Sequence, residues 1–210
     1  MRIASLVASI LLLVSVVPQS THADVLVDSG PFSELHHYIS LYDERPAQQF
    51  FQYVAGQFTL NQAFNISSVE GYMIPPHGGV VLKLYRDAAG LPGNQLFSDT
   101  FQFPSSSDPL WEVAGPALNW SAPAGTYWLS FEPTAGSDFG SMPGVVAHPL
   151  AAYATLSNNA RSWTRADNIE VGFRVNGTFV PEPSGCELAF IAIGAVVAAS
   201  RRRTLSRRAS

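Results

Sequence analysis

Short runs of alternating or clustered apolar residues, separated by groups of glycine, proline and aspartate, constrain the fold of residues 24–180 more than any other feature. Apolar residues at alternate positions are typical of strands that bury one face. The regular spacing of the turn residues predicts an all-β domain, an antiparallel two-sheet sandwich with about seven to nine short strands. One short helix is also compatible with the apolar residues of the segment 30–42.

The expected strands share β-branched or aromatic residues, and they cover residues 57–60, 66–74, 80–85, 96–103, 126–131 and 169–180. The turns expected between them are the segments 75–79, 87–94, 104–109, 122–125 and 136–144, which are rich in turn-forming residues. In the second of these turns, Gly90 and Gly93 can adopt positive φ and Pro92 stiffens the loop.

Residues 1–23 have the three parts of a secretory signal peptide. Arg2 supplies the positive charge, residues 3–17 form an apolar run, and a polar segment ends at the small residue Ala23. We expect cleavage after Ala23. The alternative is an uncleaved membrane anchor, but the apolar run has about 15 residues and a spanning helix needs about 20.

The C-terminal segment 181–210 joins a proline motif to a short apolar run and a basic end. The two prolines hold an extended, exposed segment because they disfavour both helix and strand. As a helix, the apolar run 188–200 would span about 20 Å, less than the hydrocarbon core of about 30 Å. Arginines prefer the cytoplasmic side, so the tail predicts a transient inner-membrane intermediate. The motif and the first basic residues are Pro181, Glu182, Pro183, Arg201, Arg202 and Arg203.

In motif, order, spacing and charge, residues 181–208 resemble the PEP-CTERM sorting signal of exported proteins from Gram-negative bacteria. The resemblance implies processing by exosortase, a membrane transpeptidase-like enzyme, and a final location at the cell surface or in the extracellular matrix. It also implies an association with exopolysaccharide or biofilm-type growth. Cys186 and Glu187 depart from the pattern. Cys186 fits either lipid modification or an ordinary small apolar position, and Glu187 shortens the apolar run.

A second resemblance covers about residues 48–180. Its residues are Phe58-Thr59-Leu60, Ile66, Leu84-Tyr85-Arg86-Asp87, Gly90-Leu91-Pro92-Gly93 and Gly125-Thr126-Tyr127-Trp128-Leu129. They look like a jelly-roll-type ectodomain that is frequent in PEP-CTERM proteins, which implies a sandwich of jelly-roll type and no particular enzymatic activity. The predicted organisation is therefore a signal peptide (1–23), an ectodomain (24–180) and a sorting signal (181–210).

Charge and cysteine content exclude several classes of protein. Residues 24–180 contain six basic and fourteen acidic residues, a formal net charge of −8, so this domain would repel nucleic acid. The only cysteine of the chain lies in the tail, which excludes an intramolecular disulfide and a paired-cysteine metal site in the ectodomain. We expect a core large enough to fold without such crosslinks.

The residues that could carry chemistry form no recognisable motif. His36 and His37 are adjacent, so a strand or a helix would direct them away from a shared metal ion. Asp87, Asp108 and Asp138 could contribute to a calcium site, but no calcium-binding loop motif surrounds them. A glycosidase would need two of the fourteen carboxylates at a set separation, which the sequence does not reveal. We therefore expect no catalytic residue, metal or cofactor.

Tryptophans offer the most specific candidates for binding. Trp111, Trp120 and Trp163 lie near loop boundaries, where an exposed indole could stack on a sugar ring, whereas Trp128 fits the core of a strand. The alternative for all four is a place in the core of the sandwich. Taken together, the sequence predicts a non-catalytic, exported cell-envelope or extracellular-matrix protein. The alternatives are a carbohydrate-binding module and, third, a secreted hydrolase.

Overall fold

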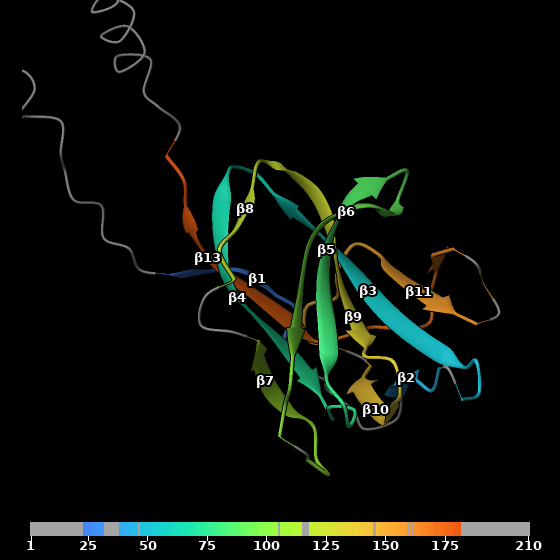
Figure 1. Ribbon diagram of the computed structural model, residues 1–210. Helices are drawn as coiled ribbons and strands as arrows, with labels where there is room; N and C mark the ends of the chain where they lie inside the picture. The colour runs from blue at the N-terminus through green and yellow to red at the C-terminus, as the bar shows by residue number, and fades with distance from the viewer. Residues whose placement is uncertain are drawn as a thin grey trace, which may run out of the picture.

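The computed structural model of the protein (Figure 1) describes residues 23–31, 38–45, 47–104, 106–114, 118–144, 146–158, 160 and 162–181. These residues form thirteen strands and no helix, so the predicted all-β class is confirmed. The strands are β1 (Asp24–Asp28), β2 (Tyr38–Asp43), β3 (Phe51–Leu60), β4 (Phe64–Met73), β5 (Val80–Ala88), β6 (Leu91–Phe101), β7 (Leu110–Ala114), β8 (Trp120–Ala122), β9 (Gly125–Pro133), β10 (Ser137–Pro143), β11 (Tyr153–Ser157), β12 (Thr164–Arg165) and β13 (Phe173–Phe179).

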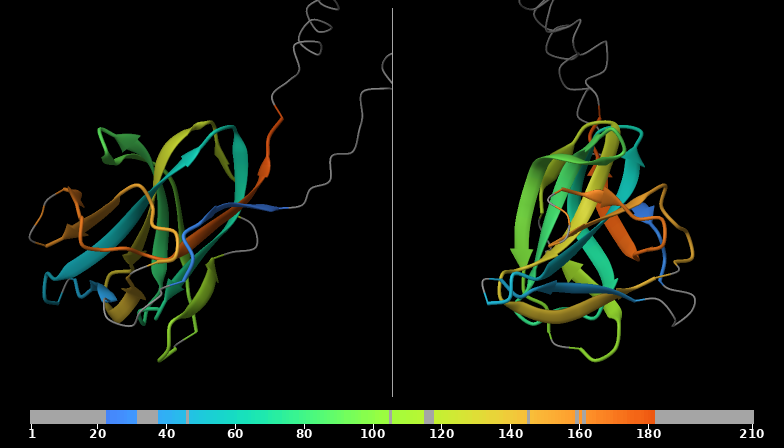
Figure 2. Two further views of the ribbon diagram at one scale, coloured as in Figure 1. Left: turned by 180° about the vertical axis from the view of Figure 1, so that it is seen from behind. Right: turned by 90° about the vertical axis from the view of Figure 1, so that its right-hand side faces the viewer.

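Two antiparallel sheets form two layers (Figure 2). The small sheet has five strands in the order β1-β13-β4-β7, with β8 paired to β4. The large sheet has eight strands in the order β10-β2-β3-β9-β5-β6, with β11 paired to β3 and to β12. The chain changes sheets repeatedly, for example from β3 to β4 and from β4 to β5, so consecutive strands often face each other across the core.

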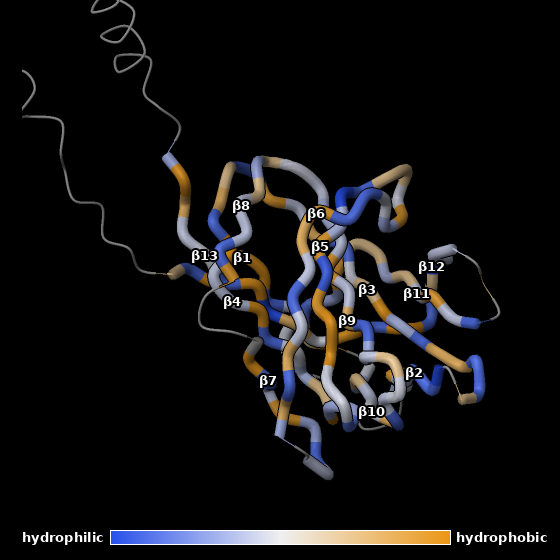
Figure 3. Tube along the Cα trace, in the orientation of Figure 1, coloured by the Kyte–Doolittle hydropathy of each residue, from blue (hydrophilic) through white to orange (hydrophobic). Residues whose placement is uncertain are grey.

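The main core lies between the sheets and receives alternate residues from strands of both, among them β3, β4, β5, β9 and β13. Phe131 of the large sheet and Phe173 of the small sheet are both fully buried, with ring centroids 6.1 Å apart. The strand β4 passes so close to Phe131 that a Cβ on Gly71 would lie 2.7 Å from its ring, which explains a glycine in a strand interior. In Figure 3, hydrophobic segments are interspersed with hydrophilic ones along the strands of both sheets.

The turn between β5 and β6 is tighter than the sequence suggested. Ala89 and Gly90 have φ values of 56° and 81°, as in the two-residue turns that suit the twist of a hairpin. Gly93 and Pro92 lie inside β6, and Gly93 is not among the positive-φ residues. Proline is tolerated there because β6 is the edge strand of the large sheet.

The first and last strands are neighbours in the small sheet. β1 pairs with β13 so that Asp24 lies opposite Gly177 and Asp28 opposite Arg174. The chain is held up to Val180, whose N–H donates to the carbonyl of Ala63 at 3.0 Å. The residues on either side of the described domain, Ala23 and Pro181, are both exposed.

The six expected strands are confirmed within β3, β4, β5, β6, β9 and β13, although the last begins only at Phe173. The expected helix over 30–42 is wrong where it can be compared, because residues 38–43 form β2. Ile39 and Leu41 suit a strand as well as a helix. Pairing of this segment with β3 and β10 selects the strand. Residues 32–37 lie outside the described residues.

The segment 136–144 was expected to be a turn but contains β10. One of its three glycines, Gly140, misled the prediction: a Cβ on Gly140 would lie 2.5 Å from the backbone nitrogen of Pro76, so this glycine permits a close approach and makes no turn. The expected number of strands, about seven to nine, was also too low, since the described residues form thirteen. β1, β7, β8, β11 and β12 are short, and too few residues show their alternation.

Among the residues that the structure describes, no helix is long and apolar enough to cross a membrane. Residues 1–22 of the predicted signal peptide and residues 182–210 of the predicted tail lie outside this set.

Candidate binding face of the large sheet

One face of the large sheet contacts the main core, and we call the opposite face the outer face. β3, β9 and β5 are adjacent in this sheet, so residues paired between them project from the same face. The pairs on the outer face alternate polar and aromatic side chains over its length. They are Thr59–Thr126, Gln57–Trp128, Ala55–Ser130, Tyr85–Trp128 and Lys83–Ser130.

At one end of the outer face, the carboxylate of Asp43 is almost completely enclosed by donors. Its Oδ1 accepts from the backbone N–H (3.1 Å) and Nε (2.8 Å) of Arg45, and its Oδ2 accepts from Arg45 Nη2 (2.6 Å) and the Tyr53 hydroxyl (2.6 Å). Burial acts to raise the pKa of Asp43, but these hydrogen bonds and the Arg45 charge outweigh it and lower the pKa. Asp43 is therefore held ionised.

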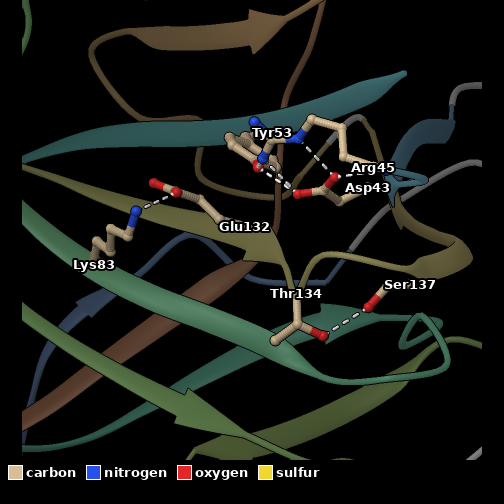
Figure 4. A network of polar contacts seen from close by, with 7 residues as sticks. All are labelled: Asp43, Arg45, Tyr53, Lys83, Glu132, Thr134 and Ser137. Carbon is tan, nitrogen blue, oxygen red and sulfur yellow. Dashed lines mark hydrogen bonds and ion pairs between the residues drawn. The ribbon is translucent and has the colours of Figure 1, made fainter. Parts of the chain in front are cut away.

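Beside this group lies a second buried carboxylate, that of Glu132 on β9 (Figure 4). Its Oε1 accepts from Tyr85 (2.8 Å) and Ser130 (2.8 Å), and its Oε2 accepts from Lys83 Nζ (2.6 Å). Lys83 is the only lysine of the chain. Burial, followed by the charge of Glu132, raises the pKa of the Tyr85 hydroxyl, which therefore remains a hydrogen-bond donor.

These contacts leave little capacity for a ligand. The two carboxylates are matched by two cations, and every fully buried side-chain polar atom in the described part of the chain has a hydrogen-bond partner. Arg45 also lies over the ring of Phe51, with its Cζ 4.4 Å from the centroid. The cluster therefore ties β2, β3, β5 and β9 together.

An aromatic cluster occupies the middle of the outer face. Trp128 is fully buried and Tyr85 nearly so, and they pack with Ala55 and Ala154. Trp163, which follows β11 in the chain, covers them: its ring lies 6.0 Å from that of Tyr85 in an edge-on arrangement. Trp163 is itself half-buried. The expectation that Trp128 belongs to a core is confirmed, although this is the smaller core on the outer face.

The other end of the outer face is more open. Here the carboxylate of Asp87 accepts hydrogen bonds from Gln57 Nε2 (2.8 Å), Trp128 Nε1 (2.8 Å) and the backbone N–H of Gly90 (3.2 Å). Burial acts to raise the pKa of Asp87, but the three hydrogen bonds lower it overall. A depression of about 350 Å³ lies beside this carboxylate at the end of the sheet. Its lining reaches both faces: Asp87 and Thr126 belong to the outer face, Arg86 and Tyr127 pair on the core-facing side, and Ala124 and Gly125 precede them at the start of β9.

The three tryptophans proposed for sugar stacking have different surroundings. Trp120 is 3% exposed, stacks on Phe97 at 5.6 Å and donates to Asp99, so the expectation of an exposed indole is wrong here. Trp111 lies on the opposite side of the molecule, on β7. Arg174 Cζ is 3.8 Å from the centre of its ring, and this guanidinium already occupies one face.

Arg174 is fixed on that side by carboxylates. It forms ion pairs with Asp28 (3.1 Å) and Glu70 (3.4 Å), which keep it over Trp111. Of the three candidates, Trp163 is therefore the one that lies on the outer face, and Trp111 is covered by a cation.

Other predicted residues are dispersed. His77 is exposed and contacts Asp138 at 2.9 Å, and His148 is exposed. No group of three or more potential metal-ligating side chains occurs among the described residues, and Asp87, Asp108 and Asp138 are not brought together. His36 and His37 lie outside these residues, as do Glu182, Pro183, Cys186, Arg201, Arg202 and Arg203.

No protein-family model matches the chain, no curated protein matches it, and no solved structure matches it. Its function is therefore inferred from its own residues and their geometry.

The sequence did not indicate which polar residues would meet on the outer face. Asp43 and Arg45 follow the segment 30–42, in which a helix was expected, and Tyr53 lies in the part of β3 that precedes the strand expected over 57–60. One signal was present: a lone lysine at the polar position of a well-predicted strand suggests a specific partner. That the partner is Glu132 depends on the pairing of β5 with β9, which a local pattern does not encode.

Proposed function

We propose that the protein is an exported component of a bacterial cell envelope or extracellular matrix, sorted through a PEP-CTERM-type tail that exosortase processes. The observation that supports this proposal most strongly is the pairing of β1 with β13. It brings the residue after the expected signal-cleavage site, Asp24, opposite Gly177, which lies just before the Pro181 motif.

This pairing matters because the antiparallel strands β1 and β13 place the start of β1 and the end of β13 at the same end of the small sheet (Figure 1). A precursor can then have both predicted membrane segments in one membrane without strain on the domain between them. Regular backbone pairing ends at Val180, and Pro181, which follows, is exposed. The motif would therefore be accessible to a membrane-bound processing enzyme while the domain stays folded.

The proposal includes a route and a set of partners. The chain passes through an inner-membrane intermediate, contacts exosortase through Pro181, Glu182 and Pro183, and reaches the cell surface or matrix, where exopolysaccharide is the expected neighbour. The net charge of −8 over residues 24–180 disfavours nucleic acid as a partner. Repeated crossing between the sheets supports the jelly-roll type, which we propose for this sandwich.

Intact mass spectrometry of the protein from the native host's envelope and medium tests this proposal. We expect loss of residues 1–23 and a new C-terminus near the motif. Replacing Pro181, Glu182 and Pro183 by alanine should leave the tail intact in the membrane fraction. Replacing the exposed Pro104 by alanine is the matched control and should leave processing unchanged. A variant without the motif that is still released with the same C-terminus would exclude the motif as the processing signal.

A second candidate function is carbohydrate binding. It is favoured by the outer face, where Trp163 and a row of polar side chains lie together. Binding of the host exopolysaccharide that is lost in Trp163→Ala but kept in Trp111→Ala would support it. The secreted hydrolase receives no comparable support, because Arg45 and Lys83 already pair with the buried carboxylates Asp43 and Glu132.

A further inference from the structure

We propose that the depression between the end of β5 and the start of β9 binds one hexopyranose unit of a neutral glycan through Arg86, Asp87 and Thr126. The depression lies beside the 89–90 turn, and its lining includes none of the tryptophans that the sequence suggested. This inference goes beyond the sorting proposal and does not depend on it.

Asp87 supplies a fixed acceptor. Its Oδ1 already accepts from Gln57 and Trp128, whereas Oδ2 accepts only from the N–H of Gly90. A carboxylate oxygen can accept two hydrogen bonds, so Oδ2 has room for one more. The three existing bonds come from β3, β9 and the turn, and they hold the carboxylate in place before a ligand arrives.

Arg86 supplies the donor. It lines the depression, and its charge and a hydrogen bond partly offset the rise that burial causes in the pKa of Tyr127. The guanidinium is thus directed towards the Tyr127 hydroxyl, which donates to the carbonyl of Pro123 at 2.7 Å. Arg86 belongs to none of the ion pairs formed by the described residues, so its remaining N–H groups can donate to a ligand.

Thr126 adds a hydroxyl on the same side of the depression as Asp87. Its Oγ1 lies 3.2 Å from Oγ1 of Thr59 across the β3–β9 pair, and only one of the two hydroxyls can donate in that contact. In either arrangement the Thr126 hydroxyl keeps a free proton or a free lone pair for a ligand. The remaining lining, Ala124 and Gly125, is small and leaves the backbone accessible.

The chemistry of the lining selects a neutral, polyhydroxylated ligand. A cation, an ionised carboxylate and a hydroxyl can donate to and accept from neighbouring hydroxyl groups, as a sugar requires. The charges of Arg86 and Asp87 cancel, so the lining has no net attraction for an anion or a cation, and an apolar ligand would leave these groups unpaired. The volume of about 350 Å³ lies at the lower end for ligand sites, which suits one sugar unit of a longer chain.

An NMR titration of the full chain, in micelles of a detergent without a sugar headgroup, tests the proposal. The probes are neutral tetrasaccharides of glucose, mannose and galactose, and a tetramer of glucuronic acid. We expect at least one neutral probe to bind with a Kd of about 1 mM and to shift the amide signals of Gly90 and Thr126. Arg86→Gln should weaken that binding about tenfold, and Thr126→Val should weaken it several-fold.

The matched control is Arg165→Gln, which removes an exposed arginine far along the chain from the depression and should leave the affinity unchanged. Normal amide spectra of the free variants show that they remain folded. The proposal is overturned if no neutral probe binds at about 10 mM. It is also overturned if Arg86→Gln binds like the parent chain, if only the glucuronic acid tetramer binds, or if binding follows Trp163 instead.

Discussion

Trp128 on β9 donates its indole N–H to the carboxylate of Asp87 on β5 at 2.8 Å. This bond connects the aromatic cluster of the outer face to the open depression beside the 89–90 turn. Because Asp87 also accepts from Gln57 and Gly90, one carboxylate joins β3, β9 and the β5–β6 hairpin. Asp87 therefore contributes both to the stability of the domain and to the proposed binding site.

Replacing Asp87 by asparagine should destabilise the domain. The amide keeps one acceptor oxygen but places an NH₂ group against at least one of the donors Gln57, Trp128 and Gly90. We expect the free energy of unfolding to fall by about 1–3 kcal/mol, measured by urea denaturation. Asp167→Asn, at a highly exposed carboxylate, is the control and should change it little. Equal stability of both variants would show that the hydrogen bonds of Asp87 contribute nothing.

Acid should weaken the fold through Asp43 and Asp87. The pKa of each is lowered from 3.8, by hydrogen bonds that outweigh burial, so the unfolded state binds protons more readily. Their contribution to stability is complete above the unfolded pKa and is lost as the pH falls through the lower folded pKa. Urea denaturation at a series of pH values should show a steep decline below about pH 4. Asp87→Asn should make that decline shallower, and an unchanged slope would contradict the prediction.

Glu112 should have the opposite effect. Burial raises its pKa from 4.5, so the folded state favours the protonated form, and ionising this residue costs free energy in the folded state. Its contribution is favourable below the unfolded pKa and is lost as the pH rises through the folded pKa. Glu112→Gln should therefore be more stable than the parent at pH 7, by less than about 1 kcal/mol, and no more stable at acidic pH. A destabilised variant at pH 7 would indicate that the carboxylate has a stabilising partner.

Local sequence patterns predicted the long strands, but they did not predict β10 or the contacts of the outer face. Strands such as β5, with Val80, Leu82 and Leu84 on the buried face, show their period over enough residues to be recognised. β10 was missed because Gly140 resembles a turn residue, although it permits contact with Pro76. The outer face could not be predicted, since Lys83 and Glu132 meet only through strand pairing, at a separation of 49 residues.

Removing the Lys83 cation should destabilise the domain, because the buried Glu132 carboxylate would lose its partner. Glu132 is 4% exposed, and Lys83→Met leaves it with only Tyr85 and Ser130 as donors. We expect a loss of about 2–3 kcal/mol in the free energy of unfolding, because an unpaired buried charge is destabilising. The double variant Lys83→Met, Glu132→Gln should recover much of that loss. A double variant as unstable as the sum of the single variants would mean that the two residues act independently.

Shortening the chain should locate the end of the fold. The last described backbone bond runs from Val180 N–H to Ala63, so a chain that ends at Val180 keeps every contact of β13. A chain that ends at Asn176 loses the pairing of Gly177, Thr178 and Phe179 with β4, together with the ring contact between Phe64 and Phe179 at 6.1 Å. In thermal denaturation, residues 24–180 should unfold cooperatively, whereas residues 24–176 should have a clearly lower Tm. Cooperative unfolding of the longer form would mean that processing beyond Val180 releases an intact domain. If that form is unfolded, the tail is required for folding, and release without it could not yield a stable protein.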